Sequence, residues 1–222
     1  MTPERFSKLK HVLSRRQPDL SILATDVHKP HNISAILRTC DAVGIHRIHA
    51  VSTGGEMRRH HMCAGGAGAW VDIEFHPDIG TATETLHAEG WTLLAAHPEA
   101  KARDYREIDY TRKVAIMLGS ELDGLDPDAV AQADEVIALP IEGMVASLNV
   151  SVAAAVILYE AQRQRSAAGL YEVSRLDKDE FDRVLFEWSY PEIAARCLAR
   201  GIPYPGLNEE GELESNPLAA EL

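Results

Sequence analysis

Apolar and polar residues alternate along the chain in blocks that predict strands and helices in turn. Short apolar runs bounded by turn residues predict strands at 20–24, 47–51, 70–75, 91–96, 114–118 and 135–139. Apolar residues that recur every three or four positions predict helices at 3–16, 33–43, 79–89, 126–133 and 147–165. Because strands and helices alternate, we expect an α/β fold with a mainly parallel sheet.

The segment 139–165 combines a strand end, a loop and the longest predicted helix. A short apolar run closes at Pro140, a loop passes through Gly143, and the helix begins at Ser147. Residues 150–158 are almost all apolar, so we expect this helix to be buried on most sides. Its first turn holds Ser147 and Asn149, where N–H groups are unpaired and the helix dipole is positive. A cap on a core helix is the commoner explanation of such residues, and a ligand site is the alternative.

Two further features define the ends of the predicted elements. Asn32 stands where it can cap the helix 33–43, and Gly44 stands where that helix should end. On the same helix Arg38 lies away from the apolar face, so we expect it to point to solvent or to a site. Beyond residue 165, helices are predicted at 174–188 and from Tyr190 to Gly201, followed by an acidic tail that we expect to be partly disordered.

These patterns divide the chain into three parts. Residues 1–18 form a basic helical extension, residues 19–165 form the α/β domain, and residues 166–222 form a C-terminal helical extension with an acidic tail.

The composition, 45% hydrophobic and 25% charged, is that of a soluble globular protein. No apolar run approaches 18 residues, so no membrane span is expected. Three widely spaced cysteines suggest reduced thiols in a cytoplasmic protein.

The net charge of −12 argues against a simple nucleic-acid binder, but the charge is unevenly distributed. Residues 1–16 hold five lysines and arginines against one glutamate, so a local site for a polyanion remains available on an acidic chain. Solvated helix surfaces are the ordinary explanation of such charges. Charge alone therefore leaves the partner open.

Three predicted strand ends carry loops that could hold a ligand, at His97-Pro98, Gly119-Ser120-Glu121 and 139–143. The sequence contains neither the Gly-rich dinucleotide motif nor a P-loop, which argues against those sites. The pair His28 and His31 and the cluster at 60–63 do not repeat the spacings of zinc sites, so we expect no metal. The nucleophile elbow of a serine hydrolase is also absent.

Three short motifs occur in order along the chain. They are N-x-x-x-x-x-R at Asn32–Arg38, G-x-E-x-x-G at Gly119–Gly124 and S-L-N at Ser147–Asn149. This set resembles the three motifs of the SpoU (SPOUT) class of RNA 2′-O-ribose methyltransferases. The stretches RRQPDL, VHKPHN, DYREIDYTR and SLNVSVAAAVILYEAQRQR extend the resemblance over nearly the whole chain. Within the class, the chain is similar to the enzymes that methylate guanosine 18 in the tRNA D-loop.

The resemblance implies an α/β fold with a deep trefoil knot near the C-terminal end of the domain. It implies S-adenosylmethionine bound in that knot, tRNA as a partner, and a homodimer whose sites are each completed by the partner chain. The residues that the resemblance assigns to the cofactor are His97, Gly119, Leu139, Ile141, Met144 and Leu148.

The resemblance also implies roles in catalysis and RNA binding. The residues implicated in catalysis are Arg38, Asn32, Glu121, Ser147 and Asn149. A guanidinium with a pKa above about 12 is a poor base, so we favour stabilisation of the 2′-alkoxide by Arg38. Phosphate contacts are expected from Arg5, Lys8, Arg16, His31, Arg163 and Arg165.

Several alternatives stay open on the sequence alone. The same methylation could act on ribosomal RNA or at the tRNA wobble position. A non-catalytic RNA-binding protein on the same fold is another interpretation, and an α/β metabolic enzyme unrelated to RNA is a distant one. The basic segment 58–61 receives no role from any of these patterns.

Overall fold

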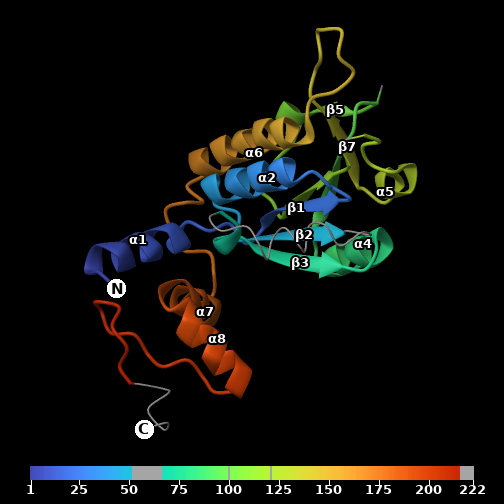
Figure 1. Ribbon diagram of the computed structural model, residues 1–222. Coiled ribbons are helices and arrows are strands. Elements are labelled where there is room, and N and C mark those ends of the chain that lie inside the picture. The colour runs from blue at the N-terminus through green and yellow to red at the C-terminus, as the bar shows by residue number, and fades with distance from the viewer. Residues whose placement is uncertain (52–66, 100, 121, 216–222) are drawn as a thin grey trace. The chain divides into compact units, whose positions relative to one another are not determined.

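The computed structural model describes residues 1–51, 67–99, 101–120 and 122–215 (Figure 1). The chain forms two compact units. One comprises residues 17–170, and the other joins residues 1–16 to the chain from Tyr171 onward. The two extensions that the sequence predicted separately therefore belong to one unit. No helix in the described part of the chain is long and apolar enough to cross a membrane.

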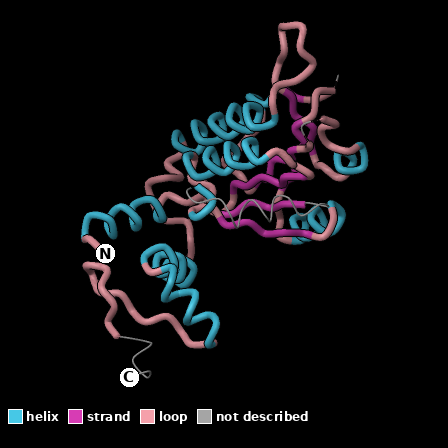
Figure 2. Tube along the Cα trace, viewed as in Figure 1, coloured by secondary structure: helices cyan, strands magenta, loops and turns pink. Residues whose placement is uncertain are grey.

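The larger unit contains a seven-stranded sheet in which every paired strand is parallel (Figure 2). The order across the sheet is β3-β2-β1-β6-β4-β7-β5. The bounds are β1 (Leu20–Thr25), β2 (Arg47–Val51), β3 (Asp72–His76), β4 (Thr92–Ala96), β5 (Arg103–Asp104), β6 (Val114–Leu118) and β7 (Glu135–Ala138). The central strands β1 and β6 are apolar almost without interruption because helices cover both faces. The predicted α/β fold with a parallel sheet is confirmed.

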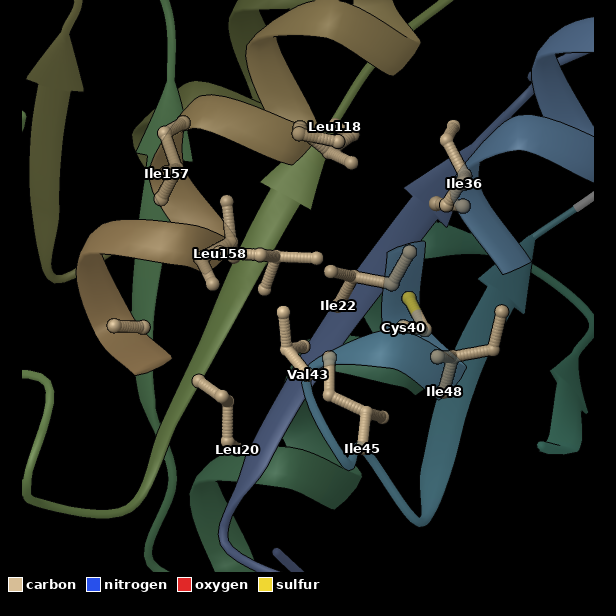
Figure 3. Packing of buried hydrophobic residues seen from close by; sticks show 14 of the residues in the cluster. Leu20, Ile22, Ile36, Cys40, Val43, Ile45, Ile48, Leu118, Ile157 and Leu158 are labelled. Atoms are coloured by element: carbon tan, nitrogen blue, oxygen red, sulfur yellow. The ribbon is translucent and has the colours of Figure 1, made fainter. Parts of the chain in front are cut away.

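Alternate strand residues contribute to two separate cores, one on each face of the sheet. Ile22 and Ile116 belong to the core with helices α2 (Pro30–Ala42) and α6 (Val150–Ala167). Figure 3 shows part of this cluster, with Ile22 near Ile36 of α2 and Leu158 of α6. Leu23 and Met117 belong to the opposite core, with α4 (Ile79–Ala88) and α5 (Pro127–Ala131). Two short 3-10 turns, η1 (Ala67–Ala69) and η2 (Tyr105–Glu107), complete this unit.

Helix α2 differs from its prediction at one end. It begins at Pro30 and is preceded by Lys29, so Asn32 lies inside the first turn and is not the N-cap. Proline is favoured at the first position of a helix, and that preference outweighed the capping signal of the asparagine. The other end agrees with the sequence, because Gly44 has a φ of 83° and follows directly on the helix C-cap.

Helix α6 begins at Val150, later than predicted, and its N-cap is Asn149 rather than Ser147. The prediction that it is buried on most sides is wrong. Val152 is 47% exposed and Tyr159 is 55% exposed, whereas Ile157 and Leu158 are fully buried. The helix therefore packs on the sheet along one face and leaves apolar side chains on the other.

The smaller unit contains the helices α1 (Pro3–Ser14), α7 (Lys178–Ser189) and α8 (Pro191–Arg200). Phe186 of α7 stacks on Tyr204 with ring centroids 4.6 Å apart. The backbone at Gly211 approaches the ring of Phe6 so closely that a Cβ there would lie 2.5 Å from it. The two ends of the chain are therefore packed together within this unit.

Candidate functional site

A cavity of about 230 Å³ opens at the carboxyl ends of β4, β6 and β7. Its walls come from the loops that follow these three strands and from the start of α6. The carboxyl ends of neighbouring parallel strands meet at one edge of a sheet, and open α/β sheets bind ligands there. The structure thus brings the three predicted ligand loops together in one place.

The loop after β6 is a tight turn that requires glycine. The N–H of Ser120 donates to the carbonyl of Gly124 at 3.0 Å, and the N–H of Gly124 donates back to the carbonyl of Ser120 at 3.1 Å. A Cβ on Gly119 would lie 2.0 Å from the backbone of Gly124, and Gly124 itself has a φ of 71°. Only glycine lets the two backbone segments approach so closely at the cavity wall.

The loop after β4 places an unpaired polar atom in a buried position. The N–H of His97 donates to the carbonyl of Ile137 at 3.0 Å, which fixes this loop beside β7. The ring nitrogen Nδ1 of His97 is buried and has no hydrogen-bond partner among the described residues. Buried polar groups are normally paired, so such an atom at a cavity wall suits a ligand with a polar group.

The opposite wall is apolar, with Leu139, Ile141 and Leu148 contributing to it. A ligand that carries both an apolar ring system and hydrogen-bonding groups fits this combination. S-adenosylmethionine, the cofactor that the resemblance implies, is of that kind. The residues that are present therefore fit it.

A pair of asparagines joins the start of α6 to α2. Asn149 donates from Nδ2 to Oδ1 of Asn32 at 3.1 Å, and its own Oδ1 accepts from the N–H of Ser151 at 2.9 Å. Asn32 is 1% exposed and Asn149 is exposed, so this amide contact is partly buried. Asn149 thus acts both as a helix cap and as a link to the helix that carries Arg38.

The predicted site residues divide into those that the cavity brings together and those that it does not. The predicted residues that line it are His97, Gly119, Leu139, Ile141, Ser147 and Leu148. Met144 does not line it, and its side chain is fully exposed. Glu121 lies outside the described residues, as does the basic segment 58–61.

Arg38 is exposed on α2 and does not line the cavity. It makes no hydrogen bond or ion pair with the described parts of the chain. Its positive charge is therefore not neutralised within the described residues.

Four of the predicted phosphate contacts are also exposed, namely Arg5, Lys8, His31 and Arg163. Arg163 pairs with Glu160 on the same helix at 2.7 Å.

Two predicted phosphate contacts are contradicted by burial. Arg16 is fully buried, and its guanidinium lies 5.1 Å from the centroid of the Trp188 ring. Arg165 is fully buried as well, and it donates to Oδ1 of Asp19 at 2.6 Å and to the carbonyl of Tyr110 at 2.8 Å. Neither guanidinium is presented to a phosphate, and Arg165 instead holds the end of α6 to the chain that leads into β1.

Further lining residues were not singled out from the sequence. They flank the same strand ends and include Ala96, Leu118, Leu122, Asp123, Ala138 and Val150. The strand-end rule that selected His97 and Gly119 would have found most of them, because they lie within a few positions of a predicted strand boundary.

Comparison with known proteins adds an independent result. The sequence matches the SpoU rRNA Methylase family over residues 19–159, and the C-terminal domain of SpoU rRNA methylases over residues 163–216. A tRNA (guanosine(18)-2′-O)-methyltransferase of Escherichia coli K12 is 49% identical over 97% of this chain and 95% of its own length. The enzyme of that name from Thermus thermophilus is 50% identical over 84% of this chain and 96% of its own.

Solved structures show the same fold. The A. aeolicus TrmH/SpoU tRNA modifying enzyme superposes with a TM-score of 0.77 at 36% identity, covering 86% of this chain and 97% of the other. The SpoU methyltransferase AviRb from Streptomyces viridochromogenes, in complex with AdoMet, superposes with a TM-score of 0.59 at 25% identity. That match covers 69% of this chain and 59% of the other.

Proposed function

Because this chain belongs to the SpoU methylase family, we propose that it transfers a methyl group from S-adenosylmethionine to the ribose 2′-OH of guanosine 18 in tRNA. The observation that carries the proposal is the cavity at the ends of β4, β6 and β7, which combines a glycine turn, an unpaired buried nitrogen and an apolar wall. The names of relatives that are 49–50% identical over most of the chain indicate the target nucleotide.

Each wall of the cavity has a separate task in this proposal. When bound, S-adenosylmethionine supplies a methyl group that its positively charged sulfur has already activated. The apolar residues Leu139, Ile141 and Leu148 would hold the cofactor from one side, and Nδ1 of His97 would be available to one of its polar groups. The turn at Gly119 would let the backbone approach it closely. These residues would thereby fix the orientation of the cofactor relative to the ribose hydroxyl.

Arg38 acts on the hydroxyl. Its guanidinium is exposed and is not neutralised by any described residue, so its charge can stabilise the 2′-alkoxide as the hydroxyl proton passes to solvent water. The contact between Asn149 and Asn32 orients the helix that carries it. Glu121 and Ser147 shape the site around the ribose in this proposal, and the position of Ser147 at the cavity wall supports its part.

We propose that the active enzyme is a cytoplasmic homodimer, in which the chain adopts the trefoil knot that its family implies. Arg38 is absent from the cavity wall of its own chain, so a second chain that brings its Arg38 to the cavity would complete the site. The exposed apolar face of α6, with Val152 and Tyr159, supports an interface there. Contacts with tRNA phosphates fall to the exposed Arg5, Lys8, His31 and Arg163.

A mixing experiment tests both the chemistry and the shared site. Labelled methyl transfer from S-adenosylmethionine to an unmodified tRNA transcript is measured for Arg38→Ala, for Gly119→Ala and for the two chains co-refolded in equal amounts. At an S-adenosylmethionine concentration near the wild-type Kd, each variant alone should have little activity. Random pairing makes half of the dimers mixed with one intact site each, so the mixture should recover about a quarter of wild-type activity.

The outcomes separate the parts of the proposal. No recovery in mixed dimers, with each variant folded, would contradict a site shared between chains. Full activity of Arg38→Ala would contradict the role of Arg38. A wild-type protein that labels ribosomal RNA and leaves tRNA unlabelled would keep the chemistry and refute the substrate.

A further inference from the structure

Three side chains with metal-binding atoms meet at the outer edge of the sheet, away from the cavity. His49 lies on β2, and Glu74 and His76 lie on the edge strand β3. The strand register pairs His49 with Glu74, and alternate residues of a strand share a face, so all three side chains project from the same face. His49 is 3% exposed, and the other two are half-buried.

The distances suit a single ion. Nδ1 of His49 lies 3.0 Å from Nε2 of His76 and 3.9 Å from Oε2 of Glu74, and the three ligand atoms all lie within 4.8 Å of one another. Two nitrogens bound to one zinc-like ion at about 2.1 Å, with an angle of about 90–110° between them, lie about 3.0–3.4 Å apart. The imidazoles are therefore already at the required spacing, and the carboxylate oxygen needs to move about 0.5 Å closer to His49 and at most about 1.4 Å closer to His76.

The two histidines also contact each other directly. In the absence of a metal, the two rings share one hydrogen bond, with one nitrogen donating and the other accepting. That bond by itself is the competing explanation of the pair, and a metal ion would replace its proton.

The carboxylate is held beside the histidines by a neighbour. Arg47 donates from Nε to Asp72 at 2.8 Å, and its Nη1 lies 3.5 Å from Oε2 of Glu74. When Glu74 turns to an ion, Arg47 keeps its stronger partner Asp72. The carboxylate can therefore be released without leaving an unpaired arginine.

We propose that His49, Glu74 and His76 bind one divalent transition-metal ion of the zinc type. Two imidazoles and one carboxylate favour zinc and its neighbours over magnesium or calcium, which prefer all-oxygen sites. Three protein ligands leave coordination positions for water. The ion joins the edge strand β3 to β2, and none of its ligands lines the cavity, so the site is independent of the proposed methyl transfer.

Calorimetric titration of Zn²⁺ into metal-stripped protein at pH 7.5 tests this site. The main variant is His76→Gln, at a half-buried position where folding should be retained, with Glu74→Gln as a second. The matched control is the triple change His60→Gln, His61→Gln and Cys63→Ser, which removes the other cluster of potential ligands in the sequence. Wild type and the control should bind one zinc per chain, and His76→Gln should bind about 100-fold more weakly.

X-ray absorption of the bound zinc supplies a readout that is independent of affinity. Nitrogen and oxygen neighbours, with two imidazoles, are expected, and the wild-type Tm should rise by about 5 °C or more at zinc well above its Kd. Any one of three results would overturn the proposal. These are sulfur in the coordination sphere, equal zinc affinity of wild type and His76→Gln, and no binding at micromolar zinc.

Discussion

Replacement of Arg165 by methionine should destabilise the protein strongly. The polar sequence at this end of α6 suggests a surface position, but the side chain is fully buried. Its guanidinium donates five hydrogen bonds. Two go to Asp19, at Oδ1 and at the backbone carbonyl, one goes to Oε1 of Gln17, and two go to the carbonyls of Tyr110 and Arg112. Methionine has a similar length but neither charge nor donors. The change removes the Arg165 counter-ion from the Asp19 carboxylate and removes a donor from three backbone carbonyls and from the Gln17 amide oxygen.

The magnitude follows from burial. Removing one partner of a buried ion pair costs about 3–5 kcal/mol, and an orphaned buried carbonyl adds about 1–3 kcal/mol. The Asp19 side chain is 16% exposed, so water partly compensates the carboxylate. We therefore expect a loss of at least about 4 kcal/mol in the free energy of unfolding. Arg165→Lys keeps the charge but provides three donors in place of the planar fork, and it should lose about 2 kcal/mol.

Urea unfolding followed by tryptophan fluorescence measures these losses. The matched control is Arg163→Met on the same helix, where the side chain is exposed and pairs, among the described residues, with Glu160, so the loss should be much smaller than for Arg165→Met. Equal losses for the two methionine variants would refute the reasoning. So would an Arg165→Lys protein that keeps wild-type stability and loses tRNA affinity, because that result would restore the phosphate contact.

Three further predictions address the turn, the amide contact and alkaline pH. Gly119→Ala should weaken S-adenosylmethionine binding at least about tenfold in calorimetry, because its Cβ would lie 2.0 Å from the Gly124 backbone. In the control Gly143→Ala, the Cβ meets nothing within 4 Å, and the cofactor should bind normally. Equal affinities of the two variants would contradict this reasoning. Asn149→Asp keeps the capping oxygen but cannot donate to Asn32, so it should lower kcat about tenfold with little loss of stability. Asn149→Ala should lower kcat and also reduce the free energy of unfolding by about 1 kcal/mol, because the cap is lost. A normal kcat in Asn149→Asp would contradict the link between the two asparagines. Burial raises the pKa of Tyr110, so the folded protein keeps this phenol protonated at pH values where the unfolded chain has lost the proton. The stability contributed by Tyr110 is complete below pH 10 and is lost as the pH rises further, and the free energy of unfolding should fall by up to about 1.4 kcal/mol per pH unit above pH 10. An unchanged slope in Tyr110→Phe would exclude Tyr110 as the source of this loss.

The sheet could be predicted well because its signals are local. The central strands β1 and β6 are short apolar runs between turn residues, and burial on both faces makes such runs continuous. The two-residue strand β5 is too short to produce a pattern, and it was not predicted. Helix α6 was predicted, but it begins three residues later than expected and its burial was overestimated, since an apolar side chain has the same pattern in the sequence whether it is buried or exposed.

Side-chain environments depended on partners that are distant in the sequence. Arg165 was taken for a surface cation because nothing near it shows that Asp19, 146 positions away, would bury it. The metal-binding atoms of His49 and His76 lie on two strands, and only the strand register brings them together. The loops of the cavity were predictable by contrast, because the end of each parallel strand is visible in the sequence and the fold brings those ends to one edge.

Methyl transfer to the ribose of guanosine 18 requires its 2′ oxygen, and a single change in the substrate removes that oxygen. Labelled methyl transfer from S-adenosylmethionine is measured with an unmodified tRNA transcript and with the same transcript carrying 2′-deoxyguanosine at position 18. We predict labelling of the first, located at guanosine 18 by nuclease mapping, and none of the second, which lacks the accepting oxygen. Equal labelling of both transcripts would contradict the account.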